Sequence, residues 1–341
     1  MRLSDCHNID DFRQLARARL PWPVFDYIDG AADDELTKAR NTAAFENADL
    51  VPDVLAGVAE IDTSCTIMGR RTALPLMLSP TAVQRAFHWQ GETAVARAAE
   101  RFGLWFGISS LATRSIEEVA ALTGGPKLFQ LYVHKDKGLN ASMIERCQAA
   151  RFDALALTVD TIVSGKRERC LRSGFTTPPR FSASALWSYA TRPRWTLDYL
   201  LREQFRLPNL DTHVREGSGK AVSIAEYFNT MLDTSMDWDT AARIRQDWGG
   251  TFCLKGVMSA ADARRAVEIG ADAIMISNHG GRQLDGSRAP FDQLREIVDT
   301  VGGEIEIICD GGVRRGTHVL KSLCAGATAA SGGRLYLYAL A

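Results

Sequence analysis

The sequence lacks the features of secreted, membrane-spanning and metal-binding chains. Its first seven residues contain no apolar run, so no secretory signal is expected. No segment approaches the roughly 18 apolar residues that a membrane span requires. The seven cysteines are scattered, without a Cys-x-x-Cys pair or zinc-like spacing, which predicts free thiols, no metal site and a reducing compartment. These absences predict a cytoplasmic protein, or one on the cytoplasmic face of a membrane.

The sequence also lacks an excess of positive or negative charge. The formal net charge is −1, so no global field attracts nucleic acid, and no nucleic-acid partner is expected. Hydrophobic residues make up 46% and charged residues 24%, a balance typical of soluble globular proteins. A length of 341 residues suits one α/β barrel with an insertion. We therefore predict a single domain over residues 1–341.

Short apolar runs recur along the chain, and helical patterns lie between several of them. The runs cover residues 74–80, 104–110, 127–133, 154–160, 252–257, 273–278, 306–312 and 329–334. Alternation of strands and helices favours parallel pairing with right-handed crossovers. Eight repeats predict a closed (β/α)8 TIM barrel. An open doubly wound sheet is the alternative, but its expected glycine-rich turn after the first strand is missing.

Two segments fall outside this rhythm. The first 50 or so residues read as a charged helical segment that precedes the barrel. About 90 residues separate the fourth and fifth strands, far more than an ordinary βα connection. We place an insertion at about residues 165–235, on the face that carries the strand ends, and interpret it as a lid, a partner surface or a membrane contact.

The most informative motif follows the sixth strand and reads Ser277-Asn278-His279-Gly280-Gly281-Arg282. Histidine accepts a proton near neutral pH, and arginine holds a carboxylate through two parallel hydrogen bonds. A base beside a carboxylate clamp favours chemistry on the carbon next to an acid group. A loop whose histidine merely caps the strand is the alternative. The other strand ends weaken that alternative, because capping does not require a lysine, an aspartate and arginines to converge.

The last two strand ends are typical of a phosphate site. In barrels of this kind, phosphate is usually held after strands seven and eight. Here these strands are followed by glycine pairs, which expose backbone N–H groups, and by Arg314 and Arg334. Polar side chains on the other strands suit the edge of a flat heteroaromatic ring, and Lys255 adds positive charge. Flavin mononucleotide (FMN) has one phosphate and one such ring, so it is the expected cofactor.

These motifs resemble the FMN-dependent L-2-hydroxy acid dehydrogenases and oxidases, a family that includes L-lactate dehydrogenase, mandelate dehydrogenase, glycolate oxidase and the flavin domain of flavocytochrome b2. The resemblance runs from about residue 20 to the last residue. It rests mainly on the string from Ser277 to Asp285. Supporting motifs are Val24-Phe25-Asp26-Tyr27, Phe129-Gln130-Leu131-Tyr132, Thr158-Val159-Asp160, Gly165-Lys166-Arg167, Leu254-Lys255-Gly256-Val257 and the segment from Asp310 to Gly316.

The resemblance implies a role for each matching position. His279 would be the catalytic base, Asp160 would stabilise its charged form, and Tyr132 would contact the substrate. The substrate would also meet Tyr27, Arg167, Arg282, Leu111 and Ala82. The implied flavin contacts are Pro80, Thr81, Ala82, Ser109, Gln130, Thr158, Lys255 and Ser277, and the implied ribityl and phosphate contacts are Asp310, Gly312, Arg314, Gly333 and Arg334.

The expected activity is oxidation of a lactate-like L-2-hydroxy acid to the 2-oxo acid. Electrons would pass to a quinone or another acceptor. Leu111, where glycolate oxidases have tryptophan, and the small Ala82 predict a pocket wider than glycolate needs, so mandelate stays open as a substrate. The alternatives are an oxidase that uses oxygen and releases hydrogen peroxide, a phosphate-binding barrel isomerase or lyase, and an inactive binding module.

Two further expectations concern partners and the end of the chain. Aromatic residues alternate with arginines over residues 186–205, a composition typical of interfacial segments, so a peripheral membrane contact is possible there. The resemblance also implies a homo-oligomer, commonly a tetramer. The chain ends at Ala341, where members of the family continue with further helices. We expect either a truncated chain or completion by another subunit, with the eighth strand otherwise exposed.

Overall fold

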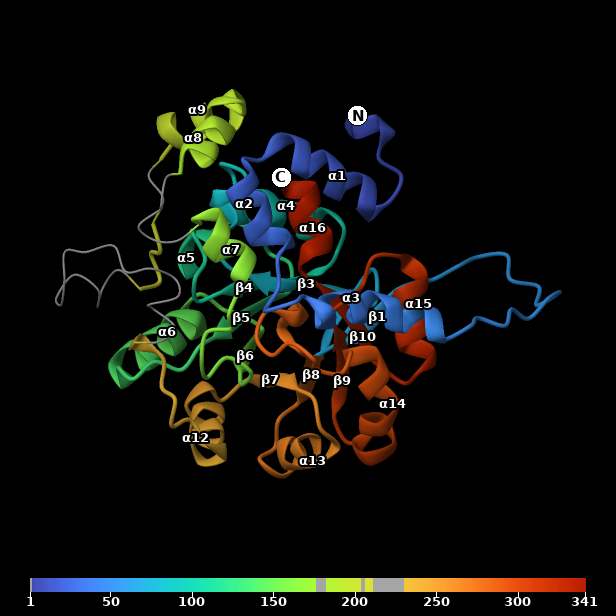
Figure 1. Cartoon of the computed structure of the whole chain (residues 1–341). Coiled ribbons are helices and arrows are strands. Elements are labelled where there is room, and N and C mark those ends of the chain that lie inside the picture. The colour runs from blue at the N-terminus through green and yellow to red at the C-terminus, as the bar shows by residue number, and fades with distance from the viewer. Residues whose placement is uncertain (1, 176–181, 204–205, 211–229) are drawn as a thin grey trace.

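The computed structural model describes residues 2–175, 182–203, 206–210 and 230–341. Eight parallel strands close into a barrel (Figure 1). In chain order they are β3 (Leu76–Thr81), β4 (Trp105–Ser109), β5 (Lys127–Leu131), β6 (Ala154–Thr158), β7 (Thr251–Val257), β8 (Ala273–Ser277), β9 (Glu306–Asp310) and β10 (Ala329–Gly332). Each predicted run overlaps one of these strands, with β3 and β7 each extending one residue beyond it, and β10 pairs with β3 to complete the ring. The predicted TIM barrel is confirmed.

Helices surround the barrel, as the alternating sequence pattern predicted. They are α4 (Glu92–Arg101), α5 (Ile116–Leu122), α6 (Lys137–Ala149), α12 (Trp238–Trp248), α13 (Ala260–Glu268), α14 (Pro290–Val301), α15 (Gly316–Cys324) and α16 (Arg334–Leu340). Several begin at a side-chain cap. Ser115 accepts a hydrogen bond from the Glu118 amide at the start of α5, and Ser259 accepts one from Asp262 at the start of α13, so backbone donors that a helix leaves unpaired are satisfied.

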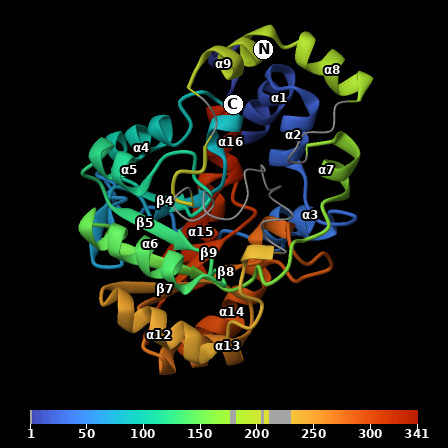
Figure 2. The same ribbon diagram turned by 90° about the vertical axis from the view of Figure 1, so that its left-hand side faces the viewer.

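The N-terminal segment is helical, as predicted. It comprises η1 (Leu3–Asp5), α1 (Ile9–Arg19), α2 (Trp22–Asp29), α3 (Leu36–Ala43) and η2 (Ala44–Asn47). In Figures 1 and 2, α1 and α16 lie side by side, next to both chain ends. The sequence expectation that β10 would be exposed is wrong. All four residues of β10 are buried, and Phe45 of η2 packs with Ala330 and Val313 in a small apolar cluster.

The insertion lies between β6 and α12. Its described helices are α7 (Glu168–Ser173), α8 (Ala183–Ala190) and α9 (Pro193–Leu201). Residues 176–181, 204–205 and 211–229 of the predicted insertion lie outside the described part of the chain. Helices α8 and α9 project together at one end of the molecule, beyond α2 (Figures 1 and 2).

The barrel interior changes character along its axis. Inward-facing residues near the start of the strands are apolar and fully buried, including Trp105, Leu128 and Met275. A short hairpin of β1 (Cys65–Ile67) and β2 (Arg70–Thr72) closes this end, and the backbone N–H of Met68 in its turn donates to the Glu306 carboxylate at 2.8 Å. The strands alternate in and out with a period of two residues, so the next inward positions lie above this apolar layer, and these are polar.

Candidate active site

A layer of polar side chains covers the apolar floor of the barrel. Six of its members lie at the ends of consecutive strands or close to them: Ser109, Gln130, Thr158, Lys255, Ser277 and Asp310. All six are buried. Lys255 Nζ lies 3.0 Å from an Asp310 carboxylate oxygen and donates to Ser277 Oγ at 3.1 Å. The Lys255–Asp310 pair is charged on both sides. Burial is the largest single influence on each group and opposes its charge, but the partner's charge and the hydrogen bonds around the pair together outweigh it, so the pKa of Lys255 is raised and that of Asp310 is lowered.

Residue 79 extends this layer, although sequence reasoning left it without a role. Ser79 Oγ donates to the second carboxylate oxygen of Asp310 at 2.6 Å and lies 2.6 Å from Ser331 Oγ of β10. Ser277 Oγ donates to Asp310 from the other side at 2.7 Å. Asp310 is therefore held by strands on both sides of the barrel. A period-two reading of β3 would have identified Ser79, because it is the polar inward residue above buried Met77.

His279 and Asp160 form an ion-pair geometry just above this layer. His279 Nδ1 lies 3.0 Å from Asp160 Oδ1, which leaves Nε2 as the ring nitrogen for a substrate. The backbone of His279 has φ +57°, an uncommon conformation for a residue with a side chain. Burial lowers the pKa of His279 below its ordinary value of 6.5, while Asp160 opposes the shift. The imidazole is therefore neutral at pH 7 and able to accept a proton.

Two guanidinium groups face the same space. Arg282 Nη1 donates to the backbone carbonyls of Tyr27 and Gly30 at 2.7 and 3.0 Å, and its guanidinium carbon lies 4.8 Å from the centre of the Tyr27 ring. Arg167 lies directly before α7 and donates to the Gln283 side chain at 3.3 Å. Burial, followed by repulsion from Arg282, lowers the pKa of Arg167. Buried cations that repel one another form a site for an anion such as a carboxylate.

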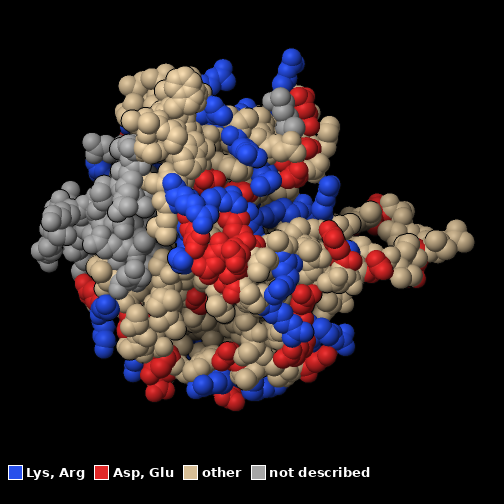
Figure 3. Space-filling view, viewed as in Figure 1, with Lys and Arg blue, Asp and Glu red and all other residues tan. Residues whose placement is uncertain are grey.

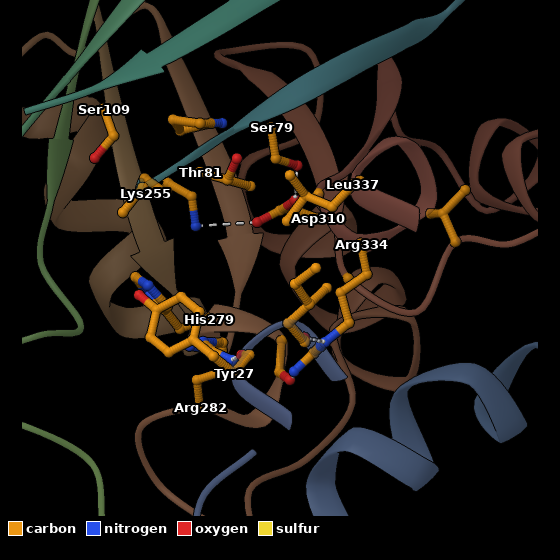
Figure 4. Close-up of a pocket in the computed structure, with 18 of the residues that line it drawn as sticks. Tyr27, Ser79, Thr81, Ser109, Lys255, His279, Arg282, Asp310, Arg334 and Leu337 are labelled. Carbon is orange, nitrogen blue, oxygen red and sulfur yellow. Dashed lines mark hydrogen bonds and ion pairs between the residues drawn. The ribbon is translucent and has the colours of Figure 1, made fainter. Parts of the chain in front are cut away.

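The opposite end of the cavity is also cationic (Figure 4). Arg334 is half-buried and donates to the backbone carbonyls of Ile28, Gly280 and Gly30. Burial lowers its pKa to about 10, and burial also lowers the pKa of Arg314. Neither arginine has a carboxylate ion pair among the described residues. This end, beside the backbone of Gly312 and Gly333, fits a phosphate group.

The cavity that joins these parts is open to solvent on one side and has a volume of about 970 Å³, which includes part of that solvent. Sixteen predicted residues line it: Tyr27, Pro80, Thr81, Ala82, Ser109, Leu111, Tyr132, Arg167, Lys255, His279, Arg282, Asp310, Gly312, Arg314, Gly333 and Arg334. The other predicted residues, Gln130, Thr158, Asp160 and Ser277, hydrogen-bond to lining residues or stand beside them in the polar layer. The predicted set is therefore brought together in one place.

Unpaired polar atoms test whether a flavin fits. Gln130 Nε2, Thr158 Oγ1 and Asp160 Oδ2 are buried and have no hydrogen-bond partner in the part of the chain that the structure describes. Buried polar atoms are normally paired, and a ligand with donors and acceptors on its edge would satisfy them. The flavin ring has both. Together with Lys255, which offers positive charge beside the ring, and the cationic end that suits a phosphate, these atoms fit FMN.

Sequence reasoning missed the apolar walls. Phe87 lies just beyond η3 (Gln84–Ala86), Ile28 lies in α2, and Leu337 lies in α16. All three line the cavity. They belong to segments outside the strand ends, and nothing local in the sequence distinguishes them from ordinary core residues. Only the packing of α2 and α16 over the barrel places them at the site.

Comparison with known proteins agrees with this geometry. The FMN-dependent dehydrogenase family matches residues 16–341. An L-lactate dehydrogenase of Alcaligenes faecalis is 39% identical over 97% of this chain and 87% of its own length. An L-lactate oxidase of Nostoc sp. is 39% identical over 98% of this chain and 87% of its own. A crystal structure of the monotopic membrane protein (S)-mandelate dehydrogenase superposes with a TM-score of 0.93, at 33% identity over 98% of this chain and 88% of that one.

These similarities decide between the interpretations that the sequence left open. A phosphate-binding isomerase or lyase and an inert binding module explain neither the flavin-compatible layer nor the His279–Asp160 pair. The match covers the whole barrel and the N-terminal segment from the last residues of α1 onward. The chain belongs to the FMN-dependent dehydrogenases, and it is an FMN-dependent oxidoreductase.

Proposed function

We propose that this FMN-dependent 2-hydroxy acid dehydrogenase oxidises L-lactate or a close relative to the 2-oxo acid and passes the electrons to a quinone. The observation that carries the proposal is the position of the His279 imidazole, which is paired with Asp160 and lies in one cavity with the Arg167 and Arg282 guanidinium groups. A 2-hydroxy acid has one carboxylate for the arginines and one hydroxyl for the base. Similarity to lactate dehydrogenases supports this assignment.

The substrate is oriented by side chains from four parts of the fold. Arg282 and Arg167 hold its carboxylate, and the hydroxyl groups of Tyr27 and Tyr132 bond the carboxylate and the substrate hydroxyl. Burial raises the pKa of Tyr132, so its hydroxyl stays protonated and donates. His279 then takes the proton that leaves the substrate, and Asp160 stabilises the resulting imidazolium. Because the site is buried, the proton passes to His279 rather than to bulk water.

The cofactor roles follow from position in the cavity. FMN, when bound, supplies the acceptor for the two electrons that leave the substrate carbon. The residues proposed to hold its ring are Pro80, Thr81, Ala82, Ser109, Gln130, Thr158, Lys255 and Ser277. Lys255 compensates the negative charge that builds on the ring edge. The residues proposed to hold its ribityl chain and phosphate are Asp310, Gly312, Arg314, Gly333 and Arg334.

Pocket width supports a substrate larger than glycolate. Leu111 and Ala82 line the cavity beside Phe87, which leaves an apolar space next to Tyr27. An apolar pocket separates substrates that differ by one methylene by only about 1–3 kcal/mol. L-Lactate is the proposed substrate, and (S)-mandelate, the substrate named for a similar structure, is the second candidate.

An anaerobic titration tests the reaction. The purified holoenzyme should show flavin absorbance, and L-lactate should bleach it with one pyruvate formed per flavin. D-Lactate, the matched control, should leave the spectrum unchanged. Rate constants for L-lactate and (S)-mandelate then rank the two substrates. A flavin that no 2-hydroxy acid reduces would contradict the proposal. Hydrogen peroxide formed in stoichiometric yield at a rate equal to quinone-linked turnover would favour the oxidase instead.

A peripheral membrane contact through α8 and α9 is also proposed. No helix among the described residues is long and apolar enough to cross a membrane. These two helices nevertheless expose apolar side chains at one end of the molecule (Figure 3), among them Trp187 at 72% and Leu201 at 78%. Trp195 points elsewhere, since its indole N–H donates to the Ala86 carbonyl at 2.9 Å. The contact therefore rests on Leu186, Trp187, Leu197, Leu200 and Leu201 rather than on every aromatic residue of 186–205. Of that segment, residues 204–205 lie outside the described chain.

Flotation with lipid vesicles tests the contact. The protein should rise with the vesicles, and the double variant Trp187→Ser, Leu201→Ser should remain in the soluble fraction. Leu320→Ser, which alters an exposed leucine on α15, is the matched control and should still float. A parent protein that stays in the soluble fraction would contradict the proposal. The location follows from this contact: we propose the cytoplasmic face of a membrane.

A homo-oligomer, with a tetramer as the starting expectation, is supported by an arm at residues 48–64. The arm has no helix or strand and projects from the body of the molecule between η2 and β1 (Figure 1). It exposes several large apolar residues, with Leu55 at 100% and Val51 at 92%. Light scattering on the parent and on Leu55→Asp tests it, because a charge at a subunit contact should reduce the mass.

A further inference from the structure

A second cavity lies against the outside of the active site and has no role in the reaction described so far. It lies between the end of α1, the segment after η3, the α8–α9 turn and helix α9, and it is open to solvent, with a volume of about 1120 Å³ that includes part of that solvent. Phe87 lines this cavity and the catalytic cavity. The two spaces are therefore separated by the thickness of one aromatic side chain. Phe87 also lies 6.1 Å from the Tyr27 ring, stacked at 27°.

The second cavity is lined by aromatic rings. Trp195 and Tyr199 stack with centroids 5.0 Å apart and an angle of 11° between their planes. The Trp195 ring is fixed by its hydrogen bond to Ala86. Trp89 lines the opposite side. Fixed aromatic rings favour planar ligands, because stacking gains energy beyond the buried area.

Two hydrogen-bond donors in this cavity lack partners. Arg192 Nε is buried without a partner, while the Nη1 of the same side chain is used by Thr191. His88 Nδ1 accepts a hydrogen bond from the backbone N–H of Gln90 at 3.3 Å. A neutral ring with Nδ1 as acceptor carries its proton on Nε2, and Nε2 has no partner among the described residues. A ligand with acceptor oxygens would satisfy both groups, whereas a ligand with donors alone would satisfy neither.

The surroundings of the second cavity favour a ligand that also has an apolar part. Helix α9, which forms one wall, exposes Leu197, Leu200 and Leu201 on its other face. A ligand with an apolar chain would therefore approach the cavity from the membrane that this face is proposed to contact. A planar ring, carbonyl oxygens and an apolar chain are combined in a quinone.

We propose that this cavity binds the ring of the quinone that reoxidises the enzyme, with His88 and Arg192 as donors to its carbonyl oxygens. The inference rests on the proposed quinone-dependent function and adds the place of binding. In each cycle the quinone takes two electrons from the reduced flavin and two protons, one from the flavin and one from solvent. It leaves as the quinol, and the flavin returns to its oxidised form. Phe87 lines both sites and forms the wall that they share.

A binding experiment without turnover tests the site. Oxidised holoenzyme without substrate is mixed with decyl-ubiquinone in non-ionic detergent, and free quinone is measured after ultrafiltration. His88→Leu and Arg192→Gln should each weaken binding about tenfold, the effect of losing one hydrogen bond to a buried group. Arg295→Gln, at an exposed arginine of α14, is the matched control and should bind as the parent does. Thermal melting of every variant checks the fold.

The two half-reactions separate this inference from the function beneath it. Anaerobic reduction of the flavin by L-lactate should proceed at parental rates in His88→Leu and Arg192→Gln, because neither residue lines the catalytic cavity. Loss of that half-reaction in the parent would contradict the proposed function itself. Unchanged quinone affinity in both variants, or displacement of the quinone by L-lactate or pyruvate, would overturn the second site and leave the function intact.

Discussion

The two ends of the catalytic cavity hold their charges in different ways. At the end formed by β6 to β9, two pairs of opposite charges occur: His279 lies against Asp160, and Lys255 against Asp310. The exceptions there are Arg167 and Arg282, the proposed carboxylate-binding pair, which have no carboxylate partner among the described residues. At the end formed by the segments after β9 and β10, Arg314 and Arg334 bond to backbone carbonyls and are not neutralised by a carboxylate among the described residues.

The difference matches the kind of charge at each end: a charge that changes during the reaction at one end, and a permanent phosphate charge at the other. A group that gains and loses a proton in every cycle needs a partner that stabilises both of its states, which is what Asp160 offers His279. A phosphate has a permanent charge, so fixed cations without partners suffice. The paired end is therefore expected to control rate and pH dependence, and the unpaired end to control cofactor retention. Variants at each end test this division.

The largest effect is expected from His279→Gln at the paired end. Glutamine keeps a hydrogen-bonding group but accepts no proton, so flavin reduction by L-lactate should slow by about 10²- to 10⁴-fold. FMN content should be unchanged. Stopped-flow absorbance under anaerobic conditions measures both. His7→Gln, at an exposed histidine, is the control. Near-normal reduction in His279→Gln would show that another group is the base.

A smaller effect, on FMN affinity rather than on the reduction rate, is expected from Arg314→Gln. Loss of a hydrogen bond to a charged group should weaken FMN binding by between about tenfold and a hundredfold, while the reduction rate at saturating FMN stays near that of the parent. Fluorescence of released flavin on dilution measures the affinity. Arg315→Gln, at the exposed neighbour, should retain FMN. A fall in the reduction rate with unchanged affinity would break the division between the two ends.

The smallest effect expected concerns the pH dependence of kcat/KM. The pKa of His279 lies below 6.5 because of burial, and the base works only when it is neutral. The ratio kcat/KM should therefore be flat at neutral pH and fall by up to tenfold per pH unit below that pKa. Asp160 opposes the lowering, so Asp160→Asn should move the inflection to lower pH as well as slow the reaction. A ratio that rises on acidification would mean that His279 acts in its protonated form.

Most of the barrel and of the polar layer could be predicted from the sequence. A buried parallel strand is a short apolar run, and the residue at its carboxyl end faces the site, so residues such as Lys255 and Asp310 are readable from position alone. The hydrogen bonds of Ser79 were not predicted, although its place in the alternating pattern of β3 was available.

What the sequence did not predict depends on long-range packing. Phe87 and Leu337 reach the site only because η3 and α16 close over the barrel. The burial of β10 depends on Phe45, nearly 300 residues earlier in the chain. The unpaired state of Arg192 Nε depends on how α8 and α9 meet α1 and η3. Periodicity describes one element at a time and does not contain these contacts.

The apolar floor beneath the polar layer has a consequence for exchange. Trp105, Leu128 and Met275 fill the barrel above the β1–β2 hairpin. The site is therefore closed at the end of the barrel where the strands begin. Substrate, product and protons therefore reach the site from the end of the barrel where the strands finish. Mutations at that end alter arrival and departure together, whereas a cavity opened in the floor would create a leak: a new route by which water reaches the reduced cofactor from below.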